Sequence, residues 1–326
     1  METSARYRRF AEVEAHGYSP CYELWCHGIA DDPDLLALID ELPPPKRQPN
    51  LILGAARYVG VTVSPLDEFK EWLVENWPTV REVAMTHHTQ TNEAGRAAVL
   101  LPALEPFAGS PVALIEIGAS AGLCLYPDRF SYRYDDEIII DPDDGRSPVL
   151  LPCTTSGRPP IPKCLPQVVF RAGIDLHPLD VRNPEDVRWL ECLVWPEQHD
   201  RLSRLRDAVA IARRHPPQLV AGDIVECIAD LVYAAPQDVP IIVFGSAVLA
   251  YLDRGDRARF ADTVRALPCT WIANEGNEVL PYDPALLPPT EVPPGRQFIL
   301  ARDGIPLGYA GPHGQSLDWF ADRRSS

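Results

Sequence analysis

The segment Val112-Ala113-Leu114-Ile115-Glu116-Ile117-Gly118-Ala119-Ser120-Ala121-Gly122 decides the fold class of this chain. An apolar run with one acid, followed by alternating small residues, is typical of a buried strand that enters a tight turn and then a helix. Such a junction offers backbone N–H groups and the positive end of a helix dipole to a polar or anionic ligand. The same letters also spell Gly118-x-Ser120-x-Gly122, the nucleophile elbow of the α/β-hydrolases. The segment therefore has two interpretations, a ligand-binding turn or an exposed catalytic serine.

Composition narrows the class of protein. The chain has 326 residues, of which 46% are hydrophobic and 23% charged, as expected for a soluble globular protein of one or two domains. It has no apolar run of roughly 18 residues, and its polar start lacks a signal peptide's apolar core, so we expect a cytoplasmic protein without membrane contacts. A net charge of −16 with no basic stripe argues against nucleic acid as a partner. The eight cysteines form no C-x-x-C pair and predict no metal site.

Hydrophobic periodicity predicts an α/β protein with two parts. Residues 1 to about 110 show helical spacing with proline and glycine boundaries, which predicts an all-helical cap. From residue 111 to 326, short apolar strands alternate with helices, which predicts a Rossmann-like, mainly parallel sheet. Only five residues separate the last two strands, so the sheet should end in an antiparallel hairpin. Residues 126–167 fit no β-α-β unit and are interpreted as an insertion beside the first turn, a candidate pocket wall. The predicted strands are 112–117, 168–174, 218–221, 241–244, 270–273, 297–301 and 307–310.

Acidic side chains follow successive predicted strands. A ligand with a ribose needs a carboxylate at the end of the second strand, where Asp175 stands. Asp223 ends the third strand, where an acceptor would meet an adenine amino group, and Ile224 would cover the ring. After the fourth strand, Ser246 belongs to a small-residue opening beneath the ligand. One such acid alone would be read as a helix cap, but acids in register with successive strand ends favour a nucleotide-like ligand.

The hydrolase interpretation is weaker. Ser120 would need an acid and a histidine later in the chain, and His313 is late enough. However, an α/β-hydrolase elbow follows several strands, whereas this turn ends the first strand, and no H-G-G-G segment precedes it. A dinucleotide is also disfavoured, because its G-x-G-x-x-G fingerprint would need glycines where Ser120 and Leu123 stand.

The pattern Glu116-x-Gly118-x-Ser120-x-Gly122 resembles the first motif of class I S-adenosylmethionine-dependent methyltransferases, [DE]-x-G-x-G-x-G, with Ser120 in place of the middle glycine. The terminal hairpin strengthens this resemblance, which implies a seven-stranded sheet. More closely, nearly the whole chain resembles an uncharacterised bacterial family with that type of fold. The segments that carry this second resemblance are Gln48-Pro49-Asn50, Gln90-Thr91-Asn92-Glu93-x-x-Arg96, Glu116 to Leu123, Gly173-Ile174-Asp175-x-x-Pro178-x-Asp180 and Trp195-Pro196-x-Gln198.

The methyltransferase resemblance implies S-adenosylmethionine as the cofactor and gives each candidate residue a role. The turn would pass close to the methionine moiety and the two acids would hold ribose and adenine, while polar residues of the cap would hold the methionine amino and carboxylate groups. Ser120 then serves as a small residue that permits close approach. These residues are Gly118, Ala119 and Gly122 with Glu116 steadying the turn, Asp175 and Asp223, and Gln90, Asn92 and Arg96.

We therefore expect a transferase that acts on a small molecule, most simply by methyl transfer. Methyl transfer is an in-line displacement in which the protein supplies positioning and, for some acceptors, a base. The candidate bases are His88, Glu93, Tyr251 and Glu275. Attack on another sulfonium carbon, by aminocarboxypropyl transfer or internal cyclisation, is an alternative. A serine hydrolase using Ser120 and a non-catalytic ligand sensor are the others.

Overall fold

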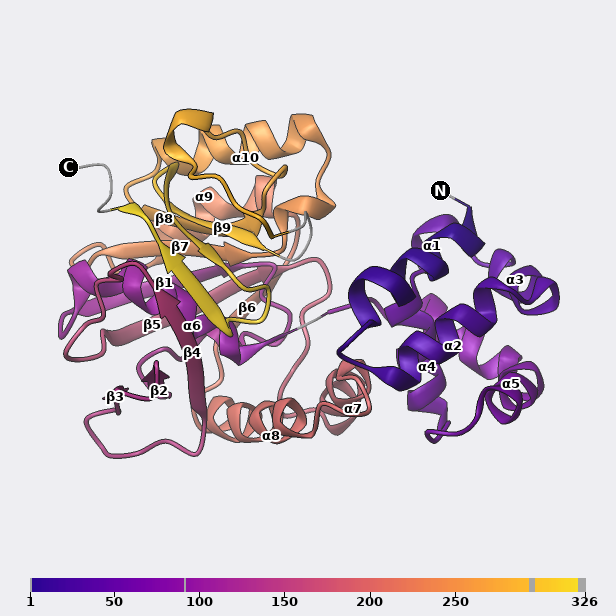
Figure 1. Ribbon diagram of the computed structural model, residues 1–326. Coiled ribbons are helices and arrows are strands. Elements are labelled where there is room, and N and C mark those ends of the chain that lie inside the picture. Colours follow the sequence, from indigo (N-terminus) through magenta and orange to yellow (C-terminus); the bar gives the residue numbers. More distant parts are fainter. Residues whose placement is uncertain (1, 91, 293–296, 322–326) are drawn as a thin grey trace. The chain divides into compact units, whose positions relative to one another are not determined.

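The computed structural model describes residues 2–90, 92–292 and 297–321, and the chain divides into two compact units (Figure 1). The first unit comprises residues 1–91 and 182–205, and the second comprises residues 92–181 and 206–326. The division falls at residue 91, not at about 110, because residues 97–107 pack with the strands. Tyr134 Oη donates a hydrogen bond to Ala98 O at 2.7 Å, and Arg302 Nη1 donates to Ala103 O at 3.2 Å.

The first unit is helical, as predicted. Two of its helices begin at proline boundaries, where Ser19 and Asp32 accept hydrogen bonds from N–H groups of the first turn. Trp25 stacks on Phe69 in the core, with ring centroids 3.9 Å apart. The helices are α1 (Thr3–Arg9), the π-helix η1 (Phe10–Ala15), α2 (Pro20–Ala30), α3 (Pro33–Asp40), η2 (Pro44–Lys46), α4 (Pro49–Val59), α5 (Leu66–Thr86) and α7 (Pro184–Leu193).

Residues 182–205 join this unit through buried polar contacts. Trp189 Nε1 donates to His88 O at 3.0 Å, and Glu197 accepts from Ser19 Oγ at 2.6 Å and from Cys21 N at 2.8 Å. The helix α8 (His199–Arg214) begins in this unit and ends in the second.

The second unit is built on one sheet of eleven strands, in the order β3-β2-β4-β11-β10-β9-β8-β7-β1-β5-β6. All seven predicted strands are present, but the prediction of a seven-stranded sheet is wrong. Residues 126–167 form three further strands that extend the sheet beyond β11, and β11 itself was not predicted. The strands are β1 (Pro111–Ile117), β2 (Ser131–Tyr134), β3 (Ile138–Ile140), β4 (Leu150–Ser156), β5 (Gln167–Asp175), β6 (Gln218–Ala221), β7 (Ile241–Ser246), β8 (Thr270–Gly276), β9 (Phe298–Arg302), β10 (Ile305–Ala310) and β11 (Ser316–Trp319).

The central strands β6, β5, β1, β7 and β8 are all parallel. From β1 the chain proceeds outward through β5 and β6 and then returns to the other side of β1 as β7. This reversal creates a topological switch point between β1 and β7, at the carboxyl edge of the sheet. The predicted antiparallel hairpin is confirmed in β9 and β10, and β9 is also antiparallel to β8.

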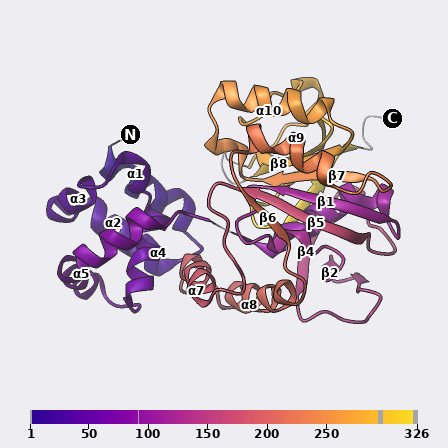
Figure 2. The same ribbon diagram turned by 180° about the vertical axis from the view of Figure 1, so that it is seen from behind.

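Helices cover both faces of this central sheet. On one face lie α9 (Ile224–Ala234) and α10 (Arg254–Ala266), whose apolar residues form one core cluster with β1, β5, β7 and β8 (Figure 2). On the other face, α6 (Ala97–Leu100) and η4 (Leu101–Phe107) contribute Ala97, Leu100 and Leu104 to an apolar layer with Leu114 and Phe244. The short helices η3 (Ala94–Arg96), η5 (Leu123–Leu125), η6 (Leu249–Tyr251) and η7 (Pro284–Leu286) complete the unit.

Among the helices within residues 2–90, 92–292 and 297–321, none has the length and apolar character that a membrane span requires.

The contact between β4 and β11 gives a test of the unexpected part of the sheet. Gly157 follows β4 with φ +79°, and a Cβ there would lie 1.9 Å from Trp319 O. Gly145 also has positive φ, at +106°, but a Cβ there would meet nothing within 4 Å. We expect Gly157→Ala to lower the free energy of unfolding by about 2 kcal/mol more than Gly145→Ala, because overpacking adds to a backbone strain that both share. Urea unfolding of both variants measures the difference, and equal midpoints would contradict this register.

Candidate functional site

The turn after β1 lies at the switch point and has an unusual backbone. Gly118, Ser120 and Gly122 have φ of +63°, +51° and +72°, so three of five consecutive residues are in the left-handed region. The turn folds back over β5, where Gly173 gives it room, since a Cβ on Gly173 would lie 2.5 Å from Ala119 Cβ. The close approach of this turn to a ligand stays a prediction.

The expected helix after the turn is absent. Only η5, a three-residue 3-10 helix, follows Gly122, and Pro127 cannot donate the N–H that a continuing α-helix needs. Two N–H groups of the turn are engaged within the protein, with Ala119 N donating to Ile174 O and Gly122 N to Ala119 O. The prediction of a helix and its dipole after the turn is therefore wrong, and contacts of a ligand with the turn backbone stay a prediction.

Asp175, at the end of β5, holds the turn in place. Its Oδ2 accepts a hydrogen bond from Ser120 N and its Oδ1 accepts from His177 N, both at 2.8 Å. The carboxylate is half-buried. Asp175 thus lies beside the turn, where a ribose was expected.

The other predicted adenine-side residues have structural roles. Asp223 is the N-cap of α9, and its Oδ1 accepts from Val225 N at 2.7 Å. The side chain of Ile224 is 6% exposed and packs in the core cluster with α10 and β7. It is therefore not available to cover an adenine ring. The helix-cap interpretation of Asp223 is therefore confirmed, and the expectation for Ile224 is wrong.

Asn92 and Arg96, two of the predicted contacts, are buried in the second unit next to the turn. Asn92 Nδ2 donates to Ala119 O at 3.2 Å, while its Oδ1 accepts from Leu123 N at 2.8 Å. Arg96 donates from Nη1 to Ser246 O at 2.9 Å and from Nε to Pro312 O at 3.1 Å. The side chain of Glu93 caps η3 by accepting from Gly95 N at 2.9 Å. These residues hold together the turn, the end of β7 and the loop after β10.

Two buried carboxyl groups lie at the carboxyl ends of β1 and β8. Burial raises the pKa of Glu116 well above its usual range, an effect that the Cys124 thiol and the Arg96 guanidinium oppose. Burial also raises the pKa of Glu275 to about 7, although Glu275 Oε1 accepts from Val248 N at 2.9 Å and Leu249 N at 3.1 Å. A carboxyl group with a pKa near neutrality is suited to proton transfer at physiological pH.

Four buried polar atoms at this edge have no hydrogen-bond partner among the residues that the structure describes. They are Glu116 Oε2, Ser120 Oγ, Asn274 Oδ1 and Glu275 Oε2. Buried polar groups are rarely left unsatisfied, and each such group needs an explanation such as a water or a ligand. Their concentration at the ends of β1 and β8 marks this edge as the candidate site.

The loop after β7 forms the opposite side of the site. Ala247, with φ +58°, follows β7 as Ser120 follows β1, and its N–H donates to Asn274 O at 3.1 Å. Val248 packs against the turn, since a Cβ on Gly118 would lie 2.4 Å from Val248 Cγ2. Strained residues of this kind cluster at functional sites. Ser246, a predicted contact, accepts a hydrogen bond at Oγ from Asn274 Nδ2 at 2.9 Å.

Asn274 was missed by the sequence analysis. Asn274 and Glu275 directly follow the apolar residues Trp271, Ile272 and Ala273, so both polar residues stand at the end of a predicted strand. Only Glu275 was taken as a candidate.

The remaining predicted residues lie elsewhere. Tyr251 ends η6 and is 72% exposed, and its role as a base stays a prediction. His88 and Gln90 belong to the first unit, and their contacts with a ligand stay predictions, while Thr91 lies outside the described residues. Ser120 is 3% exposed, and no histidine within the described ranges bonds its hydroxyl, in contrast to the exposed serine of a nucleophile elbow.

The raised pKa of Glu275 makes a prediction about pH. The folded chain holds this proton to about pH 7 and the unfolded chain releases it near pH 4.5, so the contribution of Glu275 to stability falls as the pH rises through this window. We expect the stability of wild type relative to Glu275→Gln to fall by on the order of 3 kcal/mol between pH 4.5 and 7. Urea unfolding across this range measures the effect. The exposed Glu278, replaced by Gln, is the control, and parallel curves for wild type and both variants would contradict the assignment.

Comparison with known proteins identifies the family. Searches of curated proteins and of solved structures returned no match. Residues 4–319 match the family described as "Uncharacterized protein conserved in bacteria (DUF2332)", in agreement with the resemblance to an uncharacterised bacterial family. Because this match covers nearly the whole chain, the protein belongs to that family.

Proposed function

We propose that this protein binds S-adenosylmethionine at the switch point between β1 and β7 and transfers a group from it to a small molecule. The observation that supports the proposal most is the Asp175 carboxylate at the end of β5, hydrogen-bonded at 2.8 Å to the N–H of Ser120 in the turn after β1. An acid at the end of the strand next to the glycine-rich turn is the arrangement that holds a ribose in doubly wound sheets.

The proposed ligand meets a backbone that accepts it without clashes from side chains. Gly118, Ala119 and Gly122 carry small or no side chains, and Asp175 accepts the ribose hydroxyls beside the turn. The adenine amino group meets Asp223, whose capping bond uses only Oδ1. The methionine carboxylate meets the positive charge of Arg96, the buried cation at this edge.

The proposed reaction uses the site as a positioning device. The acceptor nucleophile attacks the carbon on the sulfonium sulfur in line with the bond that breaks, and the electron pair of that bond stays on the sulfur. An acceptor that must lose a proton delivers it to Glu275 Oε2, which has no partner among the described residues. The carboxyl pKa of about 7 lets Glu275 take up that proton near neutral pH.

Two variants of this proposal share the same ligand. Attack on the aminocarboxypropyl carbon, from another molecule or from within the ligand, releases methylthioadenosine in place of S-adenosylhomocysteine. A sensor would bind the ligand and release neither product. To distinguish these outcomes, the protein and S-adenosylmethionine are incubated with the small-molecule fraction of a cell extract. The products are then analysed for methylthioadenosine and S-adenosylhomocysteine.

A serine hydrolase is the second candidate, and one observation favours it. Ser120 has φ +51°, the kind of strained conformation in which elbow serines are held. The burial of Ser120 opposes this role. We expect a fluorophosphonate probe to leave Ser120 unlabelled, as measured by mass spectrometry of tryptic peptides with a Ser120→Ala variant as the blank. Stoichiometric labelling of Ser120 would replace the transferase proposal with a hydrolase.

Calorimetric titration tests the cofactor directly. We expect S-adenosylmethionine and S-adenosylhomocysteine to bind the wild type, and Asp175→Ala to weaken both by about 10- to 100-fold, the value of a hydrogen bond to a charged group. Asp303→Ala is the matched control, because its carboxylate also accepts a backbone N–H, that of Trp271 at 2.8 Å, outside the site. The control should bind like the wild type. Absence of binding to the wild type would refute the proposal.

A further inference from the structure

A cavity lies in the second unit, away from the switch point. Its volume is about 570 Å³, within the range of small-molecule sites. It is bounded by the start of β5 at Val168 and Val169, by the loop of residues 142–148, and by the end of α8 with the prolines that follow. The loop of residues 142–148 belongs to the segment 126–167, which the sequence indicated as a candidate pocket wall beside the first turn.

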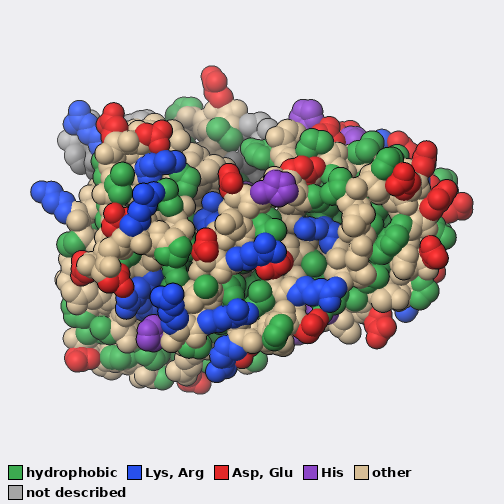
Figure 3. Space-filling view, turned by 90° about the horizontal axis from the view of Figure 1, so that it is seen from below, with side chains coloured by type: hydrophobic (Ala, Val, Ile, Leu, Met, Phe, Trp, Pro, Cys, Tyr) green, Lys and Arg blue, Asp and Glu red, His purple; other side chains and the backbone are tan. Residues whose placement is uncertain are grey.

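Positive charge gathers in this cavity although the chain as a whole is acidic. Four arginines and one acid, Asp144, line it, which gives a net charge of +3 with His215 neutral, whereas the chain carries −16. Figure 3 shows arginine and lysine side chains grouped on the left part of the face, with a histidine among them. The arginines that line the cavity are Arg129, Arg146, Arg171 and Arg214.

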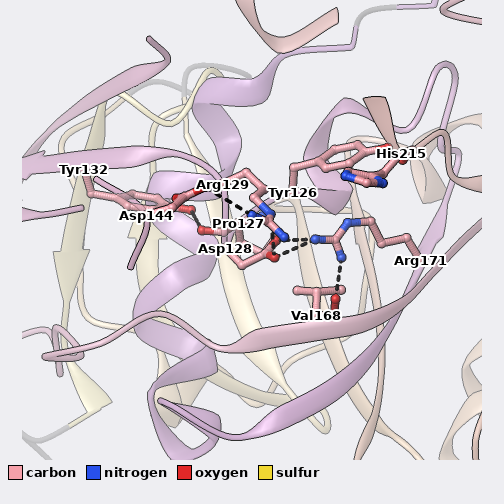
Figure 4. Close-up of polar contacts among 9 residues, drawn as sticks. All are labelled: Tyr126, Pro127, Asp128, Arg129, Tyr132, Asp144, Val168, Arg171 and His215. Carbon is pink, nitrogen blue, oxygen red and sulfur yellow. Dashed lines mark hydrogen bonds and ion pairs between the residues drawn. The ribbon is translucent and has the colours of Figure 1, made fainter. Parts of the chain in front are cut away.

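Arg171 forms the inner wall and is built into the fold. Its Nη2 donates to both oxygens of Asp128 at 2.7 and 2.5 Å, its Nη1 donates to Val168 O at 2.8 Å, and its guanidinium carbon lies 5.0 Å from the centre of the Tyr126 ring (Figure 4). Tyr126 in turn donates from Oη to His215 O at 2.6 Å. Arg171 Nε is buried and has no partner among the described residues.

The arginines of the cavity outnumber the acids that pair with them. Arg129 approaches Asp128 at 3.3 Å and Asp144 at 3.5 Å, and Asp128 is already engaged by Arg171. For Arg146 and Arg214, both exposed, no acid of the described ranges lies within ion-pair distance. Like charges around one cavity repel each other, and a bound anion would relieve that repulsion.

We propose that this cavity binds a small phosphorylated molecule. Guanidinium groups present planar pairs of N–H donors that match phosphate oxygens, and Arg129, Arg146 and Arg214 place three of them around one space. The apolar Val168 and Ile211 also line the cavity and give room for an organic moiety of nucleotide size. The ligand is therefore a phosphate ester or a nucleotide.

This site is separate from the proposed cofactor site. Both use β5, but the cavity lies at its amino end and Asp175 lies at its carboxyl end, seven residues after Val168, or roughly 23 Å along an extended strand. S-adenosylmethionine carries a positive sulfonium group and is a poor match for an arginine-lined cavity. The two proposals can therefore fail independently.

Calorimetric titration of the full chain with sodium pyrophosphate and with AMP tests this proposal. We expect both to bind, and the double variant Arg146→Ala/Arg214→Ala to weaken them at least 10-fold. We also expect the affinity to fall as NaCl is raised from 50 to 300 mM, because salt screens exposed charges. Arg254→Ala is the matched control, since Arg254 is exposed on α10 and does not line the cavity, and it should bind like the wild type. Equal melting temperatures of the double variant and the control establish that both are folded.

Three outcomes would overturn the inference. They are absence of binding of both probes to the wild type, an equal loss of affinity in Arg254→Ala and the double variant, and tighter binding of citrate than of either phosphate probe. The Asp175→Ala variant should retain pyrophosphate binding. Loss of pyrophosphate binding in that variant would contradict the separation of the two sites.

Discussion

The position of β1 between β5 and β7 is the constraint on which the second unit depends. β1 pairs in parallel on both sides and is buried on both faces from Val112 onward, so every backbone group of the strand is committed within the sheet. The chain can leave the carboxyl end only by turning sharply over a neighbour. The left-handed residues of the turn and the missing side chain at Gly173 satisfy that requirement. The same geometry opens the sheet at the switch point, so the most constrained backbone in the unit and the candidate site coincide.

Arg96 has a comparable role among the side chains. Its guanidinium is buried and joins η3 to the end of β7 and to Pro312, residues more than 100 positions away in sequence. It also provides the positive charge that partly offsets the burial of Glu116 and Glu275. A buried arrangement of one cation and two carboxyl groups with unsatisfied oxygens costs stability compared with an apolar core. This cost in stability is expected at a site where a bound ligand or a proton completes the hydrogen bonding. For this reason the candidate site is this edge of the sheet and not the apolar layer under α6.

The sequence allowed the central sheet to be predicted because its strands are continuous apolar runs separated by helices of clear periodicity. In the segment 126–167, Tyr132, Tyr134 and Ile138 to Ile140 favour extended structure by their sequence, and they form β2 and β3. That β2 to β4 continue the main sheet could not be predicted, because their placement depends on contacts distant in sequence, such as that of Tyr134 with Ala98. The helix expected after Gly122 was wrong because small residues alone do not commit a turn to a helix when Asn92, distant in sequence, takes the N–H of Leu123. Asp175 was found from its place after a strand, whereas Asn274 gains importance only through its neighbours Ser246 and Ala247 in space.

Net charge is a poor guide to local chemistry in this protein. A charge of −16 disfavours association with the extended phosphate backbone of nucleic acid, which requires a wide positive surface. A small anion samples only the potential inside one cavity, where a few arginines outweigh distant acids because solvent and salt screen charges beyond about 10 Å. The net negative charge of the chain would then disfavour larger polyanions, which extend beyond the cavity. The acidic residues that oppose the binding of polyanions to the whole protein would thus make the arginine-lined cavity selective for small anions.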